Sequence, residues 1–293
     1  MMKPEGIIVP IITPMTEDEK FNEAQMRVEV NRLIDGGVSG IFALGTNGEV
    51  YALTEEEKLA VIRVVVDEVK GRVPVYAGTG CIGTRETVEM SKKAEGLGVD
   101  ALSVVSPYFV GVSQDDIFRH FDAVAGAVKI PMLLYNMPAR TGNNIGYQTV
   151  KKLMEAHSNI MGAKDSSGNF DNTLRYIENT VDGVSVLAGN DSLILWTLLA
   201  GGTGAISGWS NAFPKLICSI YNHWKAGDTE AANKAQKAIR PFRDVMTMGN
   251  PNSVVKRCLN LLGHNVGPAR EPASGIDPKI DTALKAAFEG YRE

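Results

Sequence analysis

Short apolar segments alternate along the chain with longer amphipathic segments. Each apolar segment is rich in Val, Ile, Leu and Ala and ends in a turn of Gly, Thr, Asn or Pro. Eight such segments are found, at residues 6–13, 39–46, 73–79, 101–107, 130–136, 160–165, 184–190 and 203–208. Near-continuous apolar strands joined by helices are typical of a parallel sheet that helices cover. Eight strand–helix units in roughly 210 residues predict an α/β fold, a closed (β/α)8 TIM barrel.

The helical segments begin with residues that suit helix N-termini. Thr54 precedes EEEKLAVIRVVVDEV and Thr84 precedes RETVEMSKKAEGL, so each threonine is expected to cap its helix. Beyond residue 209 the strand pattern stops, and helices are predicted over 211–226, 228–248, 252–262 and 277–292. We therefore expect a barrel at residues 1–225 that carries the active site, followed by a C-terminal helical extension at residues 226–293.

Composition and charge narrow the class of protein. The chain has 293 residues and a net charge of −4, without long runs of one sign, which argues against a nucleic-acid or membrane-surface partner. No apolar stretch reaches the ~18 residues that a membrane span needs. The three cysteines are scattered without a C-x-x-C pair, and the first residues lack a signal-peptide pattern, so a cytoplasmic protein is expected.

Lys164 ends the sixth apolar segment, IMGAKD. Active sites of such barrels lie at the carboxyl ends of the strands. Because strand side chains alternate in direction, Gly162 and Ile160 are expected to point into the barrel if Lys164 does. Removal from water favours a neutral amine, which can attack a ketone and form a Schiff base. The alternative is a structural ion pair with a carboxylate such as that of Asp165.

Polar residues at two other strand ends extend this candidate site. Tyr135 ends the neighbouring strand at the matching level, where its phenol could relay protons. In the turn GTNGE (45–49), two glycines permit unusual dihedral angles and exposed N–H groups suit a carboxylate, while Thr46 adds a hydroxyl and Asn47 an amide. Arg140, in the loop after Tyr135, could grip a second carboxylate. Taken singly, these features also fit packing, an ordinary turn and a solvated arginine.

Metal chemistry is not expected from the histidines and cysteines. None of the four histidines ends a strand or lies four residues from another, and no Cys/His cluster has ligand spacing.

The motif order GTNGE, SPYF, YNMPART, GAKDSSGN, LAGND, GAISG and NPNSVVK resembles the dihydrodipicolinate synthase and N-acetylneuraminate lyase family over nearly the whole chain. This resemblance implies a barrel with a helical C-terminal extension, a homotetramer built from dimers, and neither a metal nor an organic cofactor. It implies a Schiff base on Lys164, with Tyr135 and Thr46 as catalytic residues. The pyruvate carboxylate would lie against Thr46 and Asn47, and the pocket would be lined by Gly189 and Ile206.

The resemblance also implies a substrate. YNMPARTG matches the synthase pattern, in which the arginine, here Arg140, holds the carboxylate of L-aspartate 4-semialdehyde. We therefore expect condensation of pyruvate with this aldehyde to 4-hydroxy-tetrahydrodipicolinate, a step of lysine biosynthesis. The alternative is retro-aldol cleavage of a 2-keto-3-deoxy sugar acid, or of an N-acetylneuraminate-like substrate, to pyruvate and an aldehyde.

Several departures from the synthase pattern keep this alternative open. Phe109 stands where the synthases usually have a second tyrosine that reaches the neighbouring subunit's site, and phenylalanine cannot carry a proton. Asn47 replaces a threonine. Trp209 is expected near the second substrate, and Asp191 could bind sugar hydroxyls. Ile82 stands where an asparagine is expected in synthases that bind lysine, so inhibition by lysine is expected to be weak or absent.

Overall fold

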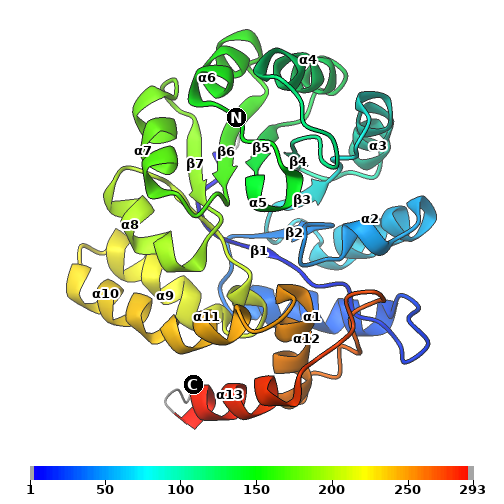
Figure 1. Cartoon of the computed structure of the whole chain (residues 1–293), viewed down its shortest axis with the longest axis vertical. Coiled ribbons are helices and arrows are strands. Elements are labelled where there is room, and N and C mark those ends of the chain that lie inside the picture. Colours follow the sequence, from blue (N-terminus) through cyan, green and yellow to red (C-terminus); the bar gives the residue numbers. More distant parts are fainter. Residues whose placement is uncertain (1–2, 290–293) are drawn as a thin grey trace.

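Eight parallel strands close into a barrel in chain order, because β1 pairs with both β2 and β8 (Figure 1). The computed structural model describes residues 3–289. The strands are β1 Gly6–Pro10, β2 Gly40–Ala43, β3 Val75–Gly78, β4 Ala101–Val105, β5 Met132–Asn136, β6 Ile160–Asp165, β7 Ser185–Ala188 and β8 Gly204–Ile206. The prediction of a (β/α)8 barrel is confirmed.

The apolar side chains of the strands form two separate layers. One cluster fills the barrel interior and contains Ile8, Phe42, Tyr76, Ala101, Leu133, Leu187 and Ile206. The residues between them in sequence, such as Val9 and Ile41, belong to a second cluster that packs against the helices. Since the interior is filled, a substrate site can open only at an end of the barrel.

Helices surround the barrel, and their starts follow capping chemistry. They are α1 Glu23–Asp35, α2 Glu55–Val69, α3 Thr84–Gly96, α4 Gln114–Ala125, α5 Pro138–Thr141, α6 Tyr147–Ala156, α7 Phe170–Asn179, α8 Ile194–Leu199 and α9 Pro214–Lys225, with 3-10 turns η1 Val50–Ala52, η2 Asp191–Leu193 and η3 Trp209–Asn211. Thr54 caps α2 and forms a capping box with Glu57, as predicted. The predicted cap at Thr84 is wrong: Gly83 precedes the helix, and the Thr84 hydroxyl bonds His120 Nδ1.

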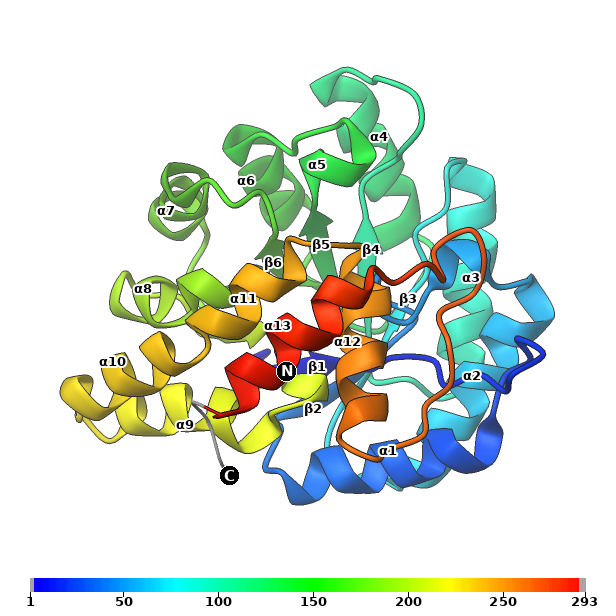
Figure 2. The ribbon, with the colours of Figure 1, turned by 60° about the horizontal axis from the view of Figure 1, so that its bottom comes forward.

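In the described part of the chain, four further helices follow α9: α10 Thr229–Ala238, α11 Arg240–Met246, α12 Pro251–Leu261 and α13 Pro278–Glu289. The single helix predicted over 228–248 is instead α10 and α11. Pro241 explains the break, since proline lacks an N–H and fits only the first turn of a helix. The helix predicted over 277–292 is found as α13, with residues 290–292 outside the described part. α13 packs against α11 and α12 (Figure 2).

The sixth strand departs from simple alternation. Its register with β5 shifts after Met132, which leaves Met161 as an extra residue of a bulge. Ile160 therefore joins the outer apolar cluster, and the expectation that it points into the barrel is wrong. Alternation resumes at Gly162, so Lys164 enters the barrel mouth.

Among residues 3–289, none of the helices combines the length and hydrophobicity that a bilayer crossing requires.

Gly162→Ala should destabilise the fold by about 1–3 kcal/mol, because overpacked interiors force backbone shifts. A Cβ there would lie 2.5 Å from the Ser185 carbonyl oxygen and 2.8 Å from Leu133 Cδ2. Urea unfolding measures this effect. Gly96→Ala is the control, since a Cβ at that position would meet no atom of a neighbouring element within 4 Å, and equal stabilities of the two variants would contradict the packing argument.

Candidate active site

A cavity at the carboxyl ends of the strands brings together the seven residues expected to be catalytic or to bind the pyruvate and the aldehyde. It has a volume of about 190 Å³. Its wall includes Thr46, Asn47, Tyr135, Arg140, Lys164, Gly189 and Ile206. These residues come from the ends of β2, β5, β6, β7 and β8, where a barrel of this kind places its chemistry.

The amine of Lys164 lies against aromatic rings. Only 4% of the residue is exposed, and Nζ lies 3.9 Å from the centroid of the Tyr135 ring and 5.5 Å from that of Phe42. Tyr135 and Lys164 are partners in the register of β5 and β6, which explains their proximity. The ring faces attract the ammonium form without supplying a permanent anion.

Asp165 is engaged elsewhere, which removes the ion pair considered above as an alternative role for Lys164. Its carboxylate accepts hydrogen bonds from Asn136 Nδ2 at 3.0 Å, Thr173 Oγ1 at 2.7 Å and the Ser167 backbone N–H at 3.0 Å. Because Asp165 follows Lys164 directly on the strand, its side chain points to the opposite face. The acid therefore anchors the β6 end to neighbouring segments and leaves the amine facing the cavity.

The phenol of Tyr135 is hydrogen-bonded on two sides. Its Oη lies 3.2 Å from Thr46 Oγ1 and donates to Met137 Sδ at 2.8 Å. Burial by itself would raise the pKa of Tyr135, but the Lys164 ammonium and the hydrogen bond with Thr46 outweigh burial, so this pKa lies below its ordinary value. The Tyr135 and Thr46 hydroxyls are thus within hydrogen-bond distance of each other, and the Lys164 amine lies over the tyrosine ring.

The turn after β2 differs from the expectation about its glycines. Left-handed φ angles occur at Leu44 (59°) and Glu49 (56°), not at Gly45 or Gly48. Gly45 is instead needed for close packing, since a Cβ there would lie 3.0 Å from the Phe42 ring. The turn is thus bent at non-glycine residues, and other contacts must hold it.

Arg140 lies on the short helix α5, where a loop was expected. Pro138 starts this helix, and Gly142 ends it with a φ of 74°. Arg140 is exposed and lines the cavity. The helix therefore fixes the backbone that carries the guanidinium at the mouth of the site.

Trp209 does not lie on the cavity wall, which corrects the expectation that it meets a second substrate. It is fully buried, with its ring centroid 5.6 Å from that of Phe242 and 6.0 Å from that of Phe213. The 3-10 turn η3 directs the indole into this aromatic cluster, and Gly208 is the residue that reaches the wall.

Part of the wall comes from the C-terminal helices, which the sequence reasoning missed. α11 supplies Arg243 and Met246, and α12 supplies Pro251 and Asn252. These residues do not directly follow the end of a strand. The rule that active-site residues lie at the carboxyl ends of the strands therefore could not identify them. Asp191, which the sequence offered for sugar hydroxyls, also lies in the wall. The remaining wall residues lie just beyond strand ends and could have been found by that rule: Met137, Ser166, Asn190 and Gly208.

Asp191 and Arg243 form an ion pair in the wall, in which the acid is buried and the arginine is partly exposed. Asp191 is 3% exposed, and its Oδ2 lies 3.5 Å from Arg243 Nη1. Burial raises the pKa of Asp191 even though Arg243 opposes the effect. A carboxyl group in this setting can accept hydrogen bonds from a polyhydroxy substrate, as considered above.

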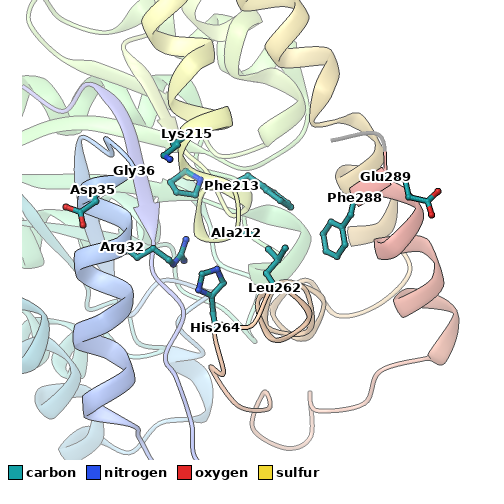
Figure 3. Close-up of a pocket in the computed structure, with 11 residues that line it drawn as sticks. Arg32, Asp35, Gly36, Ala212, Phe213, Lys215, Leu262, His264, Phe288 and Glu289 are labelled. Atoms are coloured by element: carbon teal, nitrogen blue, oxygen red, sulfur yellow. The ribbon is translucent and has the colours of Figure 1, made fainter. Parts of the chain in front are cut away.

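A larger cavity, of about 890 Å³, lies apart from this site, at the ends of α1 and α13 (Figure 3). It shares no wall residue with the active-site cavity. Its wall includes equal numbers of basic and acidic residues, namely Arg32 and Lys215, and Asp35 and Glu289. Convergent chemistry, rather than size, therefore identifies the smaller cavity as the candidate active site. Within residues 3–289, no three His, Cys, Asp or Glu side chains are grouped to hold a metal ion.

The chain matches known proteins along its length. A family model described as the dihydrodipicolinate synthetase family matches residues 3–290. The 4-hydroxy-tetrahydrodipicolinate synthase of Methanopyrus kandleri is 43% identical over 270 residues, covering 92% of this chain and 90% of that protein. Dihydrodipicolinate synthase DapA-2 of Bacillus anthracis has a TM-score of 0.96 and 33% identity, covering 100% of both chains. YagE of E. coli K12, a prophage protein solved in complex with pyruvate, has a TM-score of 0.94 and 34% identity, covering 97% of both.

Lys164→Met should raise the pKa of Tyr135, because burial then acts without a neighbouring ammonium. A pH titration of tyrosinate absorbance, with the Tyr135→Phe protein as the subtracted reference, measures this pKa. Lys151→Met, at an exposed position of α6, should leave it unchanged. An unaltered Tyr135 pKa in Lys164→Met would show that the two groups are not coupled.

Proposed function

The chain belongs to the dihydrodipicolinate synthetase family, and we propose that its Lys164 forms a Schiff base with pyruvate. The bound pyruvate then condenses with L-aspartate 4-semialdehyde. Membership makes the chain a lyase of the pyruvate-dependent aldolase type. The observation that carries the proposal is the sheltered Lys164 amine, which lies beside the Tyr135 phenol in a cavity at the strand ends.

The first step is formation of the imine. The neutral amine of Lys164 attacks the ketone carbon of pyruvate, and the resulting carbinolamine loses its hydroxyl group as water. Tyr135 donates the proton that this hydroxyl needs in order to leave, and Thr46, 3.2 Å from the phenol, hydrogen-bonds the tyrosine and supports proton return. The hydrogen bond with Thr46, which also lowers the pKa of Tyr135, persists when Lys164 is neutral and favours proton donation by the phenol.

Carbon–carbon bond formation follows from the imine. Loss of a methyl proton converts the imine to an enamine, because the iminium nitrogen takes up the electron pair. The enamine carbon attacks the aldehyde carbon, whose oxygen becomes a hydroxyl. The substrate amine then attacks the imine carbon, the ring closes, and the Lys164 amine is released for the next turnover.

Two groups of wall residues are suited to bind the carboxylates of the two substrates. Pyruvate's carboxylate would lie against Thr46 and Asn47, on the turn beside the amine, with Gly189 and Ile206 completing the wall. Binding of pyruvate by the similar protein YagE supports this part of the proposal. Arg140, at the mouth, would hold the carboxylate of the semialdehyde in two parallel hydrogen bonds.

A second candidate function is cleavage of a 2-keto-3-deoxy sugar acid to pyruvate and an aldehyde. Asp191 on the cavity wall favours it, since a buried carboxyl group can bind sugar hydroxyls. Both reactions use the same imine, so they differ only in what the outer half of the cavity recognises.

We also propose that the chain assembles into the homotetramer that the resemblance implies. Phe109 is 88% exposed with a φ of 75°, and Ile82 and Val110 are nearly half exposed. Contiguous apolar surface is typical of a protein interface, and Phe109 and Val110 are neighbours in the sequence. A second copy of the chain would cover them, and the mass of the protein in solution decides this point.

Incubation with pyruvate and borohydride should add a pyruvate-derived mass to the peptide that contains Lys164, because borohydride reduces an imine to a stable amine. Lys164→Ala should abolish the adduct, whereas Lys151→Ala should retain it. Peptide mass spectrometry locates the modification, and an adduct on another lysine would refute the proposed mechanism.

Arg140→Ala should lower kcat/KM for condensation with L-aspartate 4-semialdehyde by about 10²-fold, the effect of losing hydrogen bonds to a charged group. Pyruvate trapping on Lys164 should stay normal. Arg119→Ala, at an exposed position of α4, serves as the matched control. An unchanged condensation rate in Arg140→Ala, together with turnover of 2-keto-3-deoxygluconate, would favour the second function instead.

A further inference from the structure

A buried ion pair joins the turn after β2 to the C-terminal helices. Lys256 Nζ on α12 lies 2.5 Å from Glu49 Oε1, and the two side chains are 1% and 0% exposed. Lys256 also donates to the Pro268 carbonyl oxygen at 2.8 Å, and Glu49 Oε2 accepts the Arg270 backbone N–H at 2.7 Å. Neither Glu49 nor Lys256 lines the active-site cavity, so the proposed reaction leaves this pair unexplained.

The backbone of Glu49 needs such a partner. Its φ of 56° lies in the left-handed region, which a residue with a side chain adopts rarely and only when its surroundings enforce it. Glu49 ends the turn that carries Thr46 and Asn47, and its own N–H bonds the Thr46 carbonyl oxygen at 3.1 Å. The conformation of Glu49 and the placement of Thr46 are therefore linked directly.

The same helix face holds the turn at a second point. Asn252 lies four residues before Lys256, so the two side chains project from one face of α12. Asn252 Nδ2 donates to the Thr46 carbonyl oxygen at 2.8 Å and to Tyr51 Oη at 2.9 Å. Asn252 is 1% exposed, so its amide is held in place by the surrounding protein.

We propose that Lys256 is a positioning residue of the active site: through its ion pair with Glu49, it fixes the turn 45–49 so that Thr46 and Asn47 face the carboxylate of the keto-acid substrate. Lys256 acts through the turn and touches no substrate atom. Recognition of the keto acid rests on the proposed function, whereas the effect of Lys256 on the turn does not.

Lys256→Met, which removes the charge but keeps most of the volume, tests this proposal. The pyruvate concentration for half-maximal borohydride trapping on Lys164 should rise about ten-fold or more, since small displacements of binding groups have large effects. Arg257→Met is the matched control. Arg257 is the next residue of α12 and is also ion-paired, but its Nε bonds Asp281 Oδ1 on α13 at 2.7 Å. It should trap pyruvate with the wild-type midpoint.

A second variant guards against misfolding. Lys256→Met alone leaves the buried Glu49 carboxylate without its partner, whereas Glu49→Gln combined with Lys256→Met removes both charges of the pair and should fold. The double variant lacks the ion pair and should also show the raised midpoint. A wild-type midpoint in a folded variant that lacks the pair would overturn the proposal.

Hydrogen–deuterium exchange separates this proposal from the proposed function. Amides of residues 45–52 should exchange about ten-fold faster in the variants without the ion pair than in Arg257→Met, because the turn opens more often. If wild-type protein forms no pyruvate adduct, the proposed function fails while exchange still tests the turn. Equal exchange in all variants would overturn the positioning role.

Discussion

The Lys164 amine is withdrawn from water and lies against the Tyr135 ring, and Asp191 is the acid that shares its cavity wall. Burying an ammonium group is unfavourable, and proteins usually offset that effect with a close anion. Here the adjacent acid, Asp165, is occupied by hydroxyl and amide donors on the outer face of β6. What the amine has instead is the face of an aromatic ring and a phenol whose ionisation it favours. The roles of the other site residues follow from their positions around the Lys164 amine and the Tyr135 phenol.

The barrel and the C-terminal helices contribute different things to the site. The strands fix the reactive groups, because the register of β5 and β6 sets Tyr135 beside Lys164. The helices beyond the barrel supply part of the wall and contact the turn that carries Thr46. The active-site wall therefore includes residues from both sides of the boundary expected at residue 226.

Strand ends could be predicted from the sequence because apolar runs in a parallel barrel are nearly continuous and stop abruptly at polar turns. This explains why Lys164, Tyr135 and the GTNGE turn were found. The bulge at Met161 was missed because nothing in IMGAKD distinguishes a bulged strand from a regular one. Local conformational preference predicts left-handed φ angles at the two glycines of the GTNGE turn. In the structure, tertiary contacts place one such angle at Glu49 instead. Arg243 and Asn252 reach the cavity only through the packing of helices distant in sequence.

The charges around the cavity have a consequence for how ligands arrive. Lys164, Arg140 and Arg243 carry positive charge when protonated, and Asp191 is the acid among the wall residues. The chain as a whole has a net charge of −4. Small anions are thus repelled by the molecule as a whole at long range. They are attracted near the mouth of the active-site cavity, where the local field has the opposite sign. Dissolved salt screens the long-range repulsion and the short-range attraction to different extents. The rate at which anionic ligands encounter the cavity therefore depends on ionic strength.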